Sequence, residues 1–166
     1  MSPHAPLGLA TFLAILLGTL AQPSAEPDAR LVVAGAVPKP LELTVQDLEK
    51  LPRQAVRARE HDGSEVEFEG VPLFEVLKAA GVTFGADLRG PALADYLVVE
   101  AADGYRVVFA LPELDPASTD RPVILADRRA GRPLEKREGP LRIVMPGEKR
   151  HSRWVRQVVA LKVARG

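Results

Sequence analysis

The loop Pro146-Gly147-Glu148-Lys149-Arg150-His151-Ser152-Arg153-Trp154 concentrates side chains that can bind an anion. Arginine offers a planar fork of donors to a phosphate, lysine a point charge and serine a hydroxyl, while an indole can stack on a flat heterocycle. The alternative is that Lys149 and Arg150 are solvated and that Trp154 belongs to the core. We predict ligand contacts from six residues of this loop: Lys149, Arg150, His151, Ser152, Arg153 and Trp154.

A second row of cations precedes a predicted hairpin turn. Alternation along the strand places three of its side chains on one face: Arg57, Arg59 and His61. We predict cofactor contacts from all three. The alternative is a cross-strand charge ladder, because acidic residues have the same spacing on the returning strand, at Glu65, Glu67 and Glu69.

Other catalytic constellations are absent from the sequence. It contains no HExxH motif, no glycine-rich phosphate loop and no Gly-x-Ser-x-Gly elbow. A metal site with two histidines and a carboxylate would need His61 and His151 together with Asp62 or Glu148. Sequence spacing does not bring these groups together, and we predict no metal site.

The chain has no cysteine, which excludes disulfides, thiolate metal ligands and thiol nucleophiles. Its net charge is zero, but residues 26–119 carry 9 Lys/Arg against 17 Asp/Glu, and residues 120–166 carry 13 against 5. The basic part could attract a phosphate, another anion or an acidic partner. Alternatively, the two parts interleave in the fold and their charges are solvated. No nucleic-acid partner is expected.

Residues 1–25 have the character of a secretory signal peptide. The apolar stretch from Leu7 to Leu20 spans 14 residues, fewer than the roughly 20 that a membrane-spanning helix needs. Small and turn-forming residues follow it, so that cleavage after Ala21 or Ala25 is expected. No Lys or Arg precedes the stretch, and a retained N-terminal anchor is therefore the alternative. We predict a linker over 26–30 and a periplasmic or secreted domain over 31–166, without a membrane span after cleavage.

Apolar periodicity and turn signals predict a mixed, β-rich α+β domain with two or three short helices. Thr44 is expected to cap a helix that ends before Pro52, and Pro72 to begin a second helix that Gly81 ends. A third helical turn is expected over 111–114. Strands are predicted over 31–37, 41–45, 54–60, 66–69, 96–100, 105–109, 122–126, 141–145 and 158–163, with hairpin turns at Asp62-Gly63 and Asp103-Gly104 and with 96–100 and 105–109 as central strands.

Four stretches together resemble one known family. They are LVVAGAVPKPLEL from Leu31, FEGVPLFEVLKAAGV from Phe68, DYLVVEAADGYRVVFALPELD from Asp95 and GPLRIVMPGEKRHSRWVRQVVALKV from Gly139. In this order they are similar to the oxidoreductase molybdopterin-binding domain of sulfite oxidase-type proteins, over about residues 31–163. The resemblance implies a β-rich fold that binds molybdopterin, a pterin carrying a phosphate.

In the enzymes of that family, the dithiolene of the pterin and one protein cysteine hold molybdenum. The resemblance places this cysteine at the end of the predicted strand 54–60, next to His61, where the chain has none. Loss of the thiolate removes a metal bond and a group that tunes the redox potential, so a molybdenum oxidase of the usual type is not expected. The resemblance also implies cofactor contacts from Arg150, His151, Ser152, Arg153 and Trp154.

Two functions are compatible with these observations. In the first, an exported domain binds molybdopterin or another phosphorylated heterocycle through the basic loop, and any molybdenum is held by the dithiolene and a non-thiol group such as His61. In the second, a non-catalytic binding or accessory module without the cofactor binds a small anion, a peptide or a redox partner protein. Whether the chain is an enzyme stays open at this point.

Overall fold

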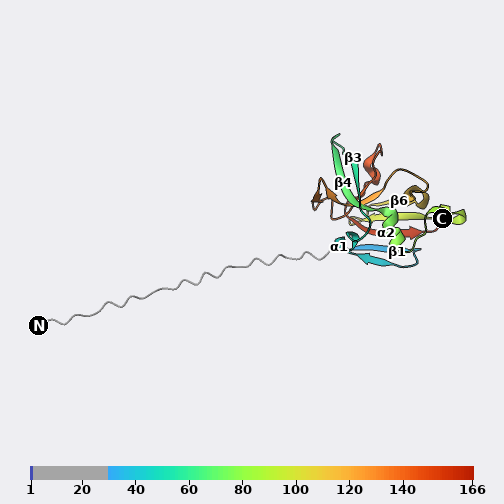
Figure 1. The fold of residues 1–166 in the computed structure, drawn as a ribbon, viewed down its shortest axis with the longest axis horizontal. Helices are drawn as coiled ribbons and strands as arrows, with labels where there is room; N and C mark the ends of the chain where they lie inside the picture. Colours follow the sequence, from blue (N-terminus) through green and yellow to red (C-terminus); the bar gives the residue numbers. More distant parts are fainter. Residues whose placement is uncertain (2–29) are drawn as a thin grey trace.

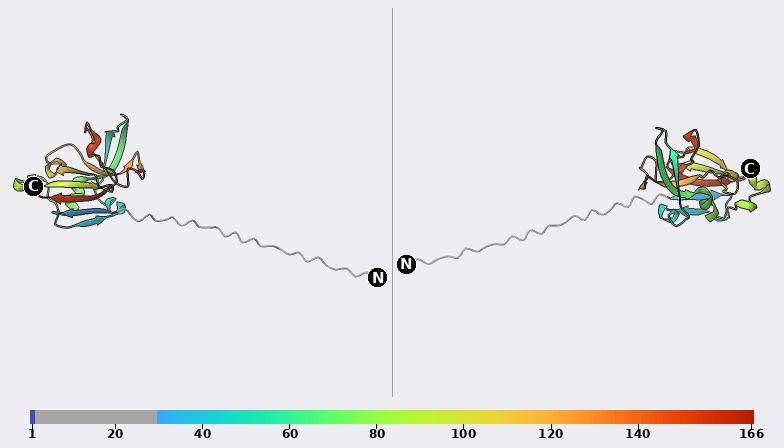
Figure 2. Two further views of the ribbon diagram at one scale, coloured as in Figure 1. Left: turned by 180° about the vertical axis from the view of Figure 1, so that it is seen from behind. Right: turned by 45° about the horizontal axis from the view of Figure 1, so that its top comes forward.

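The computed structural model describes residue 1 and residues 30–166. The predicted signal peptide and linker therefore lie outside the described residues, apart from Met1 and Arg30. The described residues form two β-sheets and three short α-helices (Figures 1 and 2). This architecture confirms the predicted β-rich α+β fold.

The first sheet has the strand order β2-β1-β10-β5-β6, in which β1 and β10 are parallel and the other pairs antiparallel. β5 lies inside the sheet as predicted, but β6 is an edge strand, and the prediction of a central strand was wrong. Only Phe109 of β6 is fully buried, and Val107 is partly buried against the core, while the other three side chains are exposed. The strands are β1 (Leu31–Gly35), β2 (Leu41–Leu43), β5 (Tyr96–Ala101), β6 (Arg106–Ala110) and β10 (Val158–Ala164).

The second sheet has the order β3-β4-β7-β8, and β9 also pairs with β7. β4 continues to Pro72, further than predicted. At Gly70 it approaches β7 so closely that an added Cβ would lie 2.1 Å from the carbonyl oxygen of Leu125, which only glycine avoids. The strands are β3 (Gln54–Arg59), β4 (Glu65–Pro72), β7 (Ile124–Arg129), the unpredicted β8 (Arg132–Pro133) and β9 (Arg142–Val144).

Short helices connect the strands. Thr44 caps α1 (Val45–Leu48) through a capping box with Asp47, as predicted. Helix α2 (Leu73–Ala79) begins one residue later than predicted, because Pro72 has extended backbone angles and ends β4. Helix α3 (Leu111–Leu114) follows β6 directly. No helix within the described part of the chain is long and apolar enough to cross a membrane.

The acidic and basic parts of the chain interleave, as the alternative interpretation of the charge asymmetry expected. Arg53 and Asp127 form a bidentate ion pair at 2.6 and 2.8 Å across the second sheet. Further pairs join Arg128 to Glu49 at 3.2 Å and Lys162 to Glu100 at 2.6 Å. Ion pairs therefore connect the two parts in both directions, and some cations after residue 120 are paired with carboxylates from earlier segments.

Two segments far apart in the sequence project on the same side of the molecule. The turn end of the β3–β4 hairpin and the loop around residue 150, which is red in Figures 1 and 2, project side by side. The rings of His61 and His151 make contact between the two segments, with centroids 4.3 Å apart. The fold thus brings together the two groups of residues singled out in the sequence.

Candidate ligand-binding site

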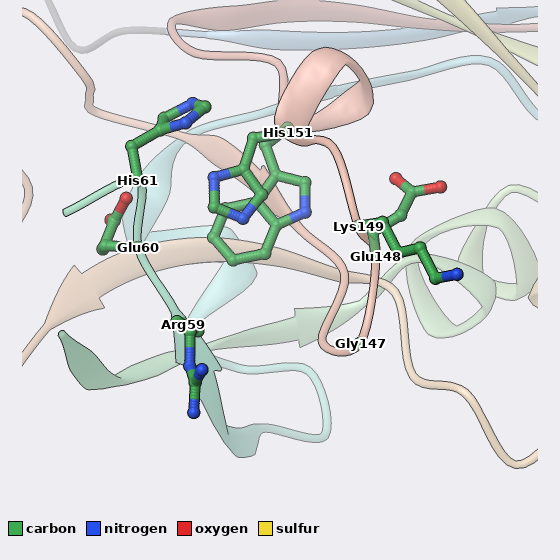
Figure 3. Close-up of a pocket in the computed structure, with 8 residues that line it drawn as sticks. Arg59, Glu60, His61, Gly147, Glu148, Lys149 and His151 are labelled. Carbon is green, nitrogen blue, oxygen red and sulfur yellow. The ribbon is translucent and has the colours of Figure 1, made fainter. Parts of the chain in front are cut away.

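A cavity of about 420 Å³ lies between the β3–β4 hairpin and the loop that leads from β9 to β10. We call it the hairpin-loop cavity. Figure 3 shows Arg59 and His61 on the hairpin side, Glu148 and Lys149 on the loop side, and His151 between them. Its volume is typical of small-molecule sites. The lining residues are Arg59, Glu60, His61, Gly147, Glu148, Lys149, His151 and Trp154.

The hairpin turn places His61 at the edge of the cavity. Asp62 accepts hydrogen bonds at Oδ1 from the backbone N–H of Ser64, at 2.9 Å, and from the Ser64 hydroxyl, at 2.6 Å. These bonds lower the pKa of Asp62. The carboxylate therefore stays ionised at neutral pH and accepts both hydrogen bonds. The backbone N–H of Glu60 donates to the carbonyl of Ser64 at 2.8 Å. The turn therefore fixes the chain on both sides of His61.

The loop wall is anchored at its two ends. The indole Nε1 of Trp154 donates to the carbonyl of Met145 at 3.2 Å. Arg153 donates from Nε to Glu148 at 3.0 Å and from Nη1 to Glu113 of α3 at 3.1 Å. These contacts leave Lys149 exposed at the rim of the cavity.

A continuous stack of rings leads from the cavity into the core. The imidazole of His151 stacks on the indole of Trp154 with centroids 4.0 Å apart and 21° between the planes. Trp154 is 4% exposed and meets Phe68 edge to face at 6.0 Å. The indole therefore belongs to the core, as the alternative interpretation held, while its edge still lines the cavity. A planar ligand would meet His151 before it met the indole.

Five of the nine predicted contact residues line the cavity, and four do not. Arg57 is exposed and lies 3.8 Å from Glu67, while Arg59 at the rim lies 3.6 Å from Glu65, so the expected charge ladder is present. Ser152 accepts a hydrogen bond at its carbonyl from the Tyr105 hydroxyl. The residues inside are Arg59, His61, Lys149, His151 and Trp154, and those outside are Arg57, Arg150, Ser152 and Arg153. Their roles in binding stay predictions.

Three lining residues were missed as ligand contacts: Glu60, Gly147 and Glu148. A glutamate next to cations suggests an exposed ion pair, and only the fold shows that Glu60 is turned inward. Glu148 was considered only as a metal ligand. Among the described residues, no group of three or more His, Cys, Asp or Glu side chains is placed to bind a metal.

His151 gives the cavity a pH dependence. Burial lowers the pKa of His151 below its ordinary value of 6.5, and electrostatic interactions with His61 and Arg142 lower it further, while Glu60 and the Arg59 backbone oppose the shift. Protonation at a lower pH adds a positive charge to the cavity wall. We predict a several-fold gain in affinity for the anion 6-carboxypterin as the pH falls from 7.5 to 5.5, measured by quenching of pterin fluorescence.

The lowered pKa of His151 affects the stability of the ligand-free protein in the opposite direction, because stability falls as the pH falls. A lowered folded-state pKa means that the folded state binds fewer protons than the unfolded chain, so stability falls as the pH drops below the ordinary value. The variant His151→Gln should lose both the gain in affinity and part of the acid sensitivity. An unchanged pH profile in this variant would show that His151 does not carry the effect.

Arg153 ties the loop to α3 and is not itself a lining residue. Its guanidinium carbon lies 4.8 Å from the centroid of Phe109, so the side chain covers apolar surface as well as pairing with Glu113 and Glu148. We predict that Arg153→Ala lowers the free energy of unfolding by about 1 kcal/mol, measured by urea denaturation. Arg150→Ala is the matched control, since its exposed side chain should change stability by less than about 0.5 kcal/mol. Equal losses in both variants would contradict the anchoring role.

Comparison with known proteins agrees with the fold. A structure of the sulfane dehydrogenase SoxCD from Paracoccus pantotrophus is similar, with a TM-score of 0.65 and 27% sequence identity over 82% of this chain. The match covers 38% of the SoxCD chain, so the present chain corresponds to well under half of that protein. No curated protein sequence matches significantly. Residues 19–165 match the family described as the oxidoreductase molybdopterin binding domain, and the chain therefore belongs to this family, as its resemblance to sulfite oxidase-type proteins predicted.

Proposed function

We propose that this chain is an exported domain that binds a pterin-type anionic cofactor in the hairpin-loop cavity. Arg59 and Lys149 attract the anionic end of the ligand at the rim, and His61 and His151 present imidazole rings to its heterocycle. Membership of the family supports molybdopterin as the ligand class. The observation that carries the proposal is the convergence of these four residues, from two distant segments, on one cavity.

The donor set fits the pterin and its phosphate better than it fits a protein-bound molybdenum. The cavity offers cations and aromatic rings, which suit an anionic heterocycle. The chain has no cysteine, so no thiolate can complete the coordination of a metal held by a dithiolene. We therefore assign the binding of the organic cofactor to this domain and derive no redox step from its residues.

Analysis of natively exported protein tests the proposal. The protein, expressed from the full sequence and purified from the periplasm of a host that makes molybdopterin, should yield pterin fluorescence after oxidation and about one phosphate per protein molecule. Molybdenum, measured by mass spectrometry, should be substoichiometric because the thiolate ligand is missing. The absence of both pterin and phosphate above background would refute the proposal.

A second candidate is a non-catalytic accessory module that docks on a redox partner. It is favoured by the stack of His151 on Trp154, which covers the indole and leaves a heterocycle less aromatic surface. Charge-led docking would weaken between low and moderate salt, because exposed charges are screened over about 8 Å at physiological ionic strength. Partner affinity that is independent of salt would contradict this candidate.

A further inference from the structure

Arg142 on β9 is the largest fully buried side chain of the described residues, at 1% exposure. It is the first residue of β9, between the buried side chains of Leu141 and Ile143, and its guanidinium carbon lies 5.3 Å from the ring centroids of both Phe68 and Trp154. Buried arginines are rare unless they are paired. The residue therefore lies directly behind the aromatic wall of the hairpin-loop cavity, without lining it.

The guanidinium is held by two carboxylates. It donates from Nη1 and Nη2 to the two oxygens of Glu60, at 2.9 and 3.3 Å, and from Nη1 to Glu138 at 3.1 Å. Burial alone would raise the pKa of Glu60, but the hydrogen bonds and charge of Arg142, together with Arg129 and His151, lower it. Glu60 is thus an ionised lining residue, and Arg142, which pairs with it, lies behind the wall of the cavity.

The opposite wall has the same arrangement. Glu148 lines the cavity, and Arg153, which does not, neutralises it through two donors. Each acidic lining residue is therefore paired with an arginine outside the cavity, while the cations Arg59 and Lys149 face its rim. Without these arginines Glu148 would lose its ion pair with Arg153, and Glu60 would keep the more distant Arg129, at 3.8 Å, so the cavity would repel an anion more strongly.

We infer that Arg142 is a positioning residue that sets the charge selectivity of the hairpin-loop cavity, by holding Glu60 against the core and neutralising it. This inference rests on the proposed function, because it assigns a determinant of anion binding at the same site. Arg142 does not touch the ligand. It also contacts Trp154, on which His151 stacks, so it fixes the hairpin wall and the aromatic wall through one group.

Three full-length variants test the inference with 6-carboxypterin as the anionic probe. Arg142→Met should weaken binding at least tenfold, because Glu60 loses both hydrogen bonds from the guanidinium and keeps the more distant Arg129, at 3.8 Å. Glu60→Gln should strengthen binding two- to threefold. The double variant Glu60→Gln with Arg142→Met should return to within threefold of the wild type, since the carboxylate that repels the probe is gone. A double variant as weak as Arg142→Met, or weaker binding by Glu60→Gln, would overturn the inference.

The pKa of His151, measured by NMR titration, provides a readout that needs no ligand. Arg142→Met should raise this pKa and Glu60→Gln should lower it, because each variant removes one charge near the imidazole. If the wild type binds no 6-carboxypterin, the proposed function fails while these shifts still test the arrangement. If Arg142→Met does not fold, Glu60→Gln decides the outcome, and an unchanged or raised pKa of His151 in that variant would overturn the inference.

Discussion

Removal of both rim cations, by Arg59→Ala together with Lys149→Ala, should weaken the binding of 6-carboxypterin about tenfold, which corresponds to 1.4 kcal/mol. The two residues approach the cavity from opposite walls, on the hairpin and on the loop. Arg59 is exposed over 72% of its side chain and lies near Glu65, so solvent and this carboxylate reduce its contribution. A fluorescence titration of the full chain at low and moderate salt measures the loss.

The matched control removes one arginine and one lysine away from the cavity, by Arg89→Ala with Lys39→Ala. Both side chains are exposed, and their loss changes the net charge by the same amount. If long-range charge alone drew the ligand in, both double variants would lose affinity equally. A loss confined to Arg59 and Lys149 instead localises the anion at the hairpin-loop cavity.

Most of the fold could be predicted from local signals. The Asp62-Gly63 and Asp103-Gly104 turns specify their hairpins, and Thr44 with Asp47 specifies the start of α1, because these preferences depend on neighbouring residues only. The edge position of β6 could not be predicted in this way. Which strand lies at an edge depends on pairing with distant segments such as β10, and the apolar run of β6 is the same in either position.

Some residues of the candidate site could likewise be predicted from the sequence, and others could not. Clusters of cations mark Arg59, His61, Lys149 and His151 in the sequence, because few structural roles need such rows. The exclusion of Arg153 follows from its ion pairs with Glu113 and Glu148, which only tertiary structure reveals. Arg142 carries one detectable signal, a charge inside the apolar strand LRIVM, but its partners Glu60 and Glu138 come from elsewhere. Sequence patterns therefore find exposed charge more readily than buried, paired charge.

Truncation of the only tryptophan, by Trp154→Ala, should lower the free energy of unfolding by about 3–5 kcal/mol, a large part of the roughly 5–15 kcal/mol of a typical domain. The indole is buried against Phe68, lies 5.3 Å from the Arg142 guanidinium and supports the ring of His151. Its loss opens a void beside a buried cation and removes the surface on which His151 stacks. Urea denaturation followed by circular dichroism measures the change.

The variant Trp154→Phe separates the contribution of ring packing from that of the hydrogen bond between the indole and the carbonyl of Met145. It keeps an aromatic ring between Phe68 and His151 but leaves the carbonyl of Met145 without its indole donor, so we expect a smaller loss, about 1–3 kcal/mol. Because the imidazole still has a ring to stack on, this variant should retain most of its affinity for 6-carboxypterin, whereas Trp154→Ala should lose it even where the protein remains folded. Equal affinities in the two variants would show that the stack stabilises the domain without shaping the cavity.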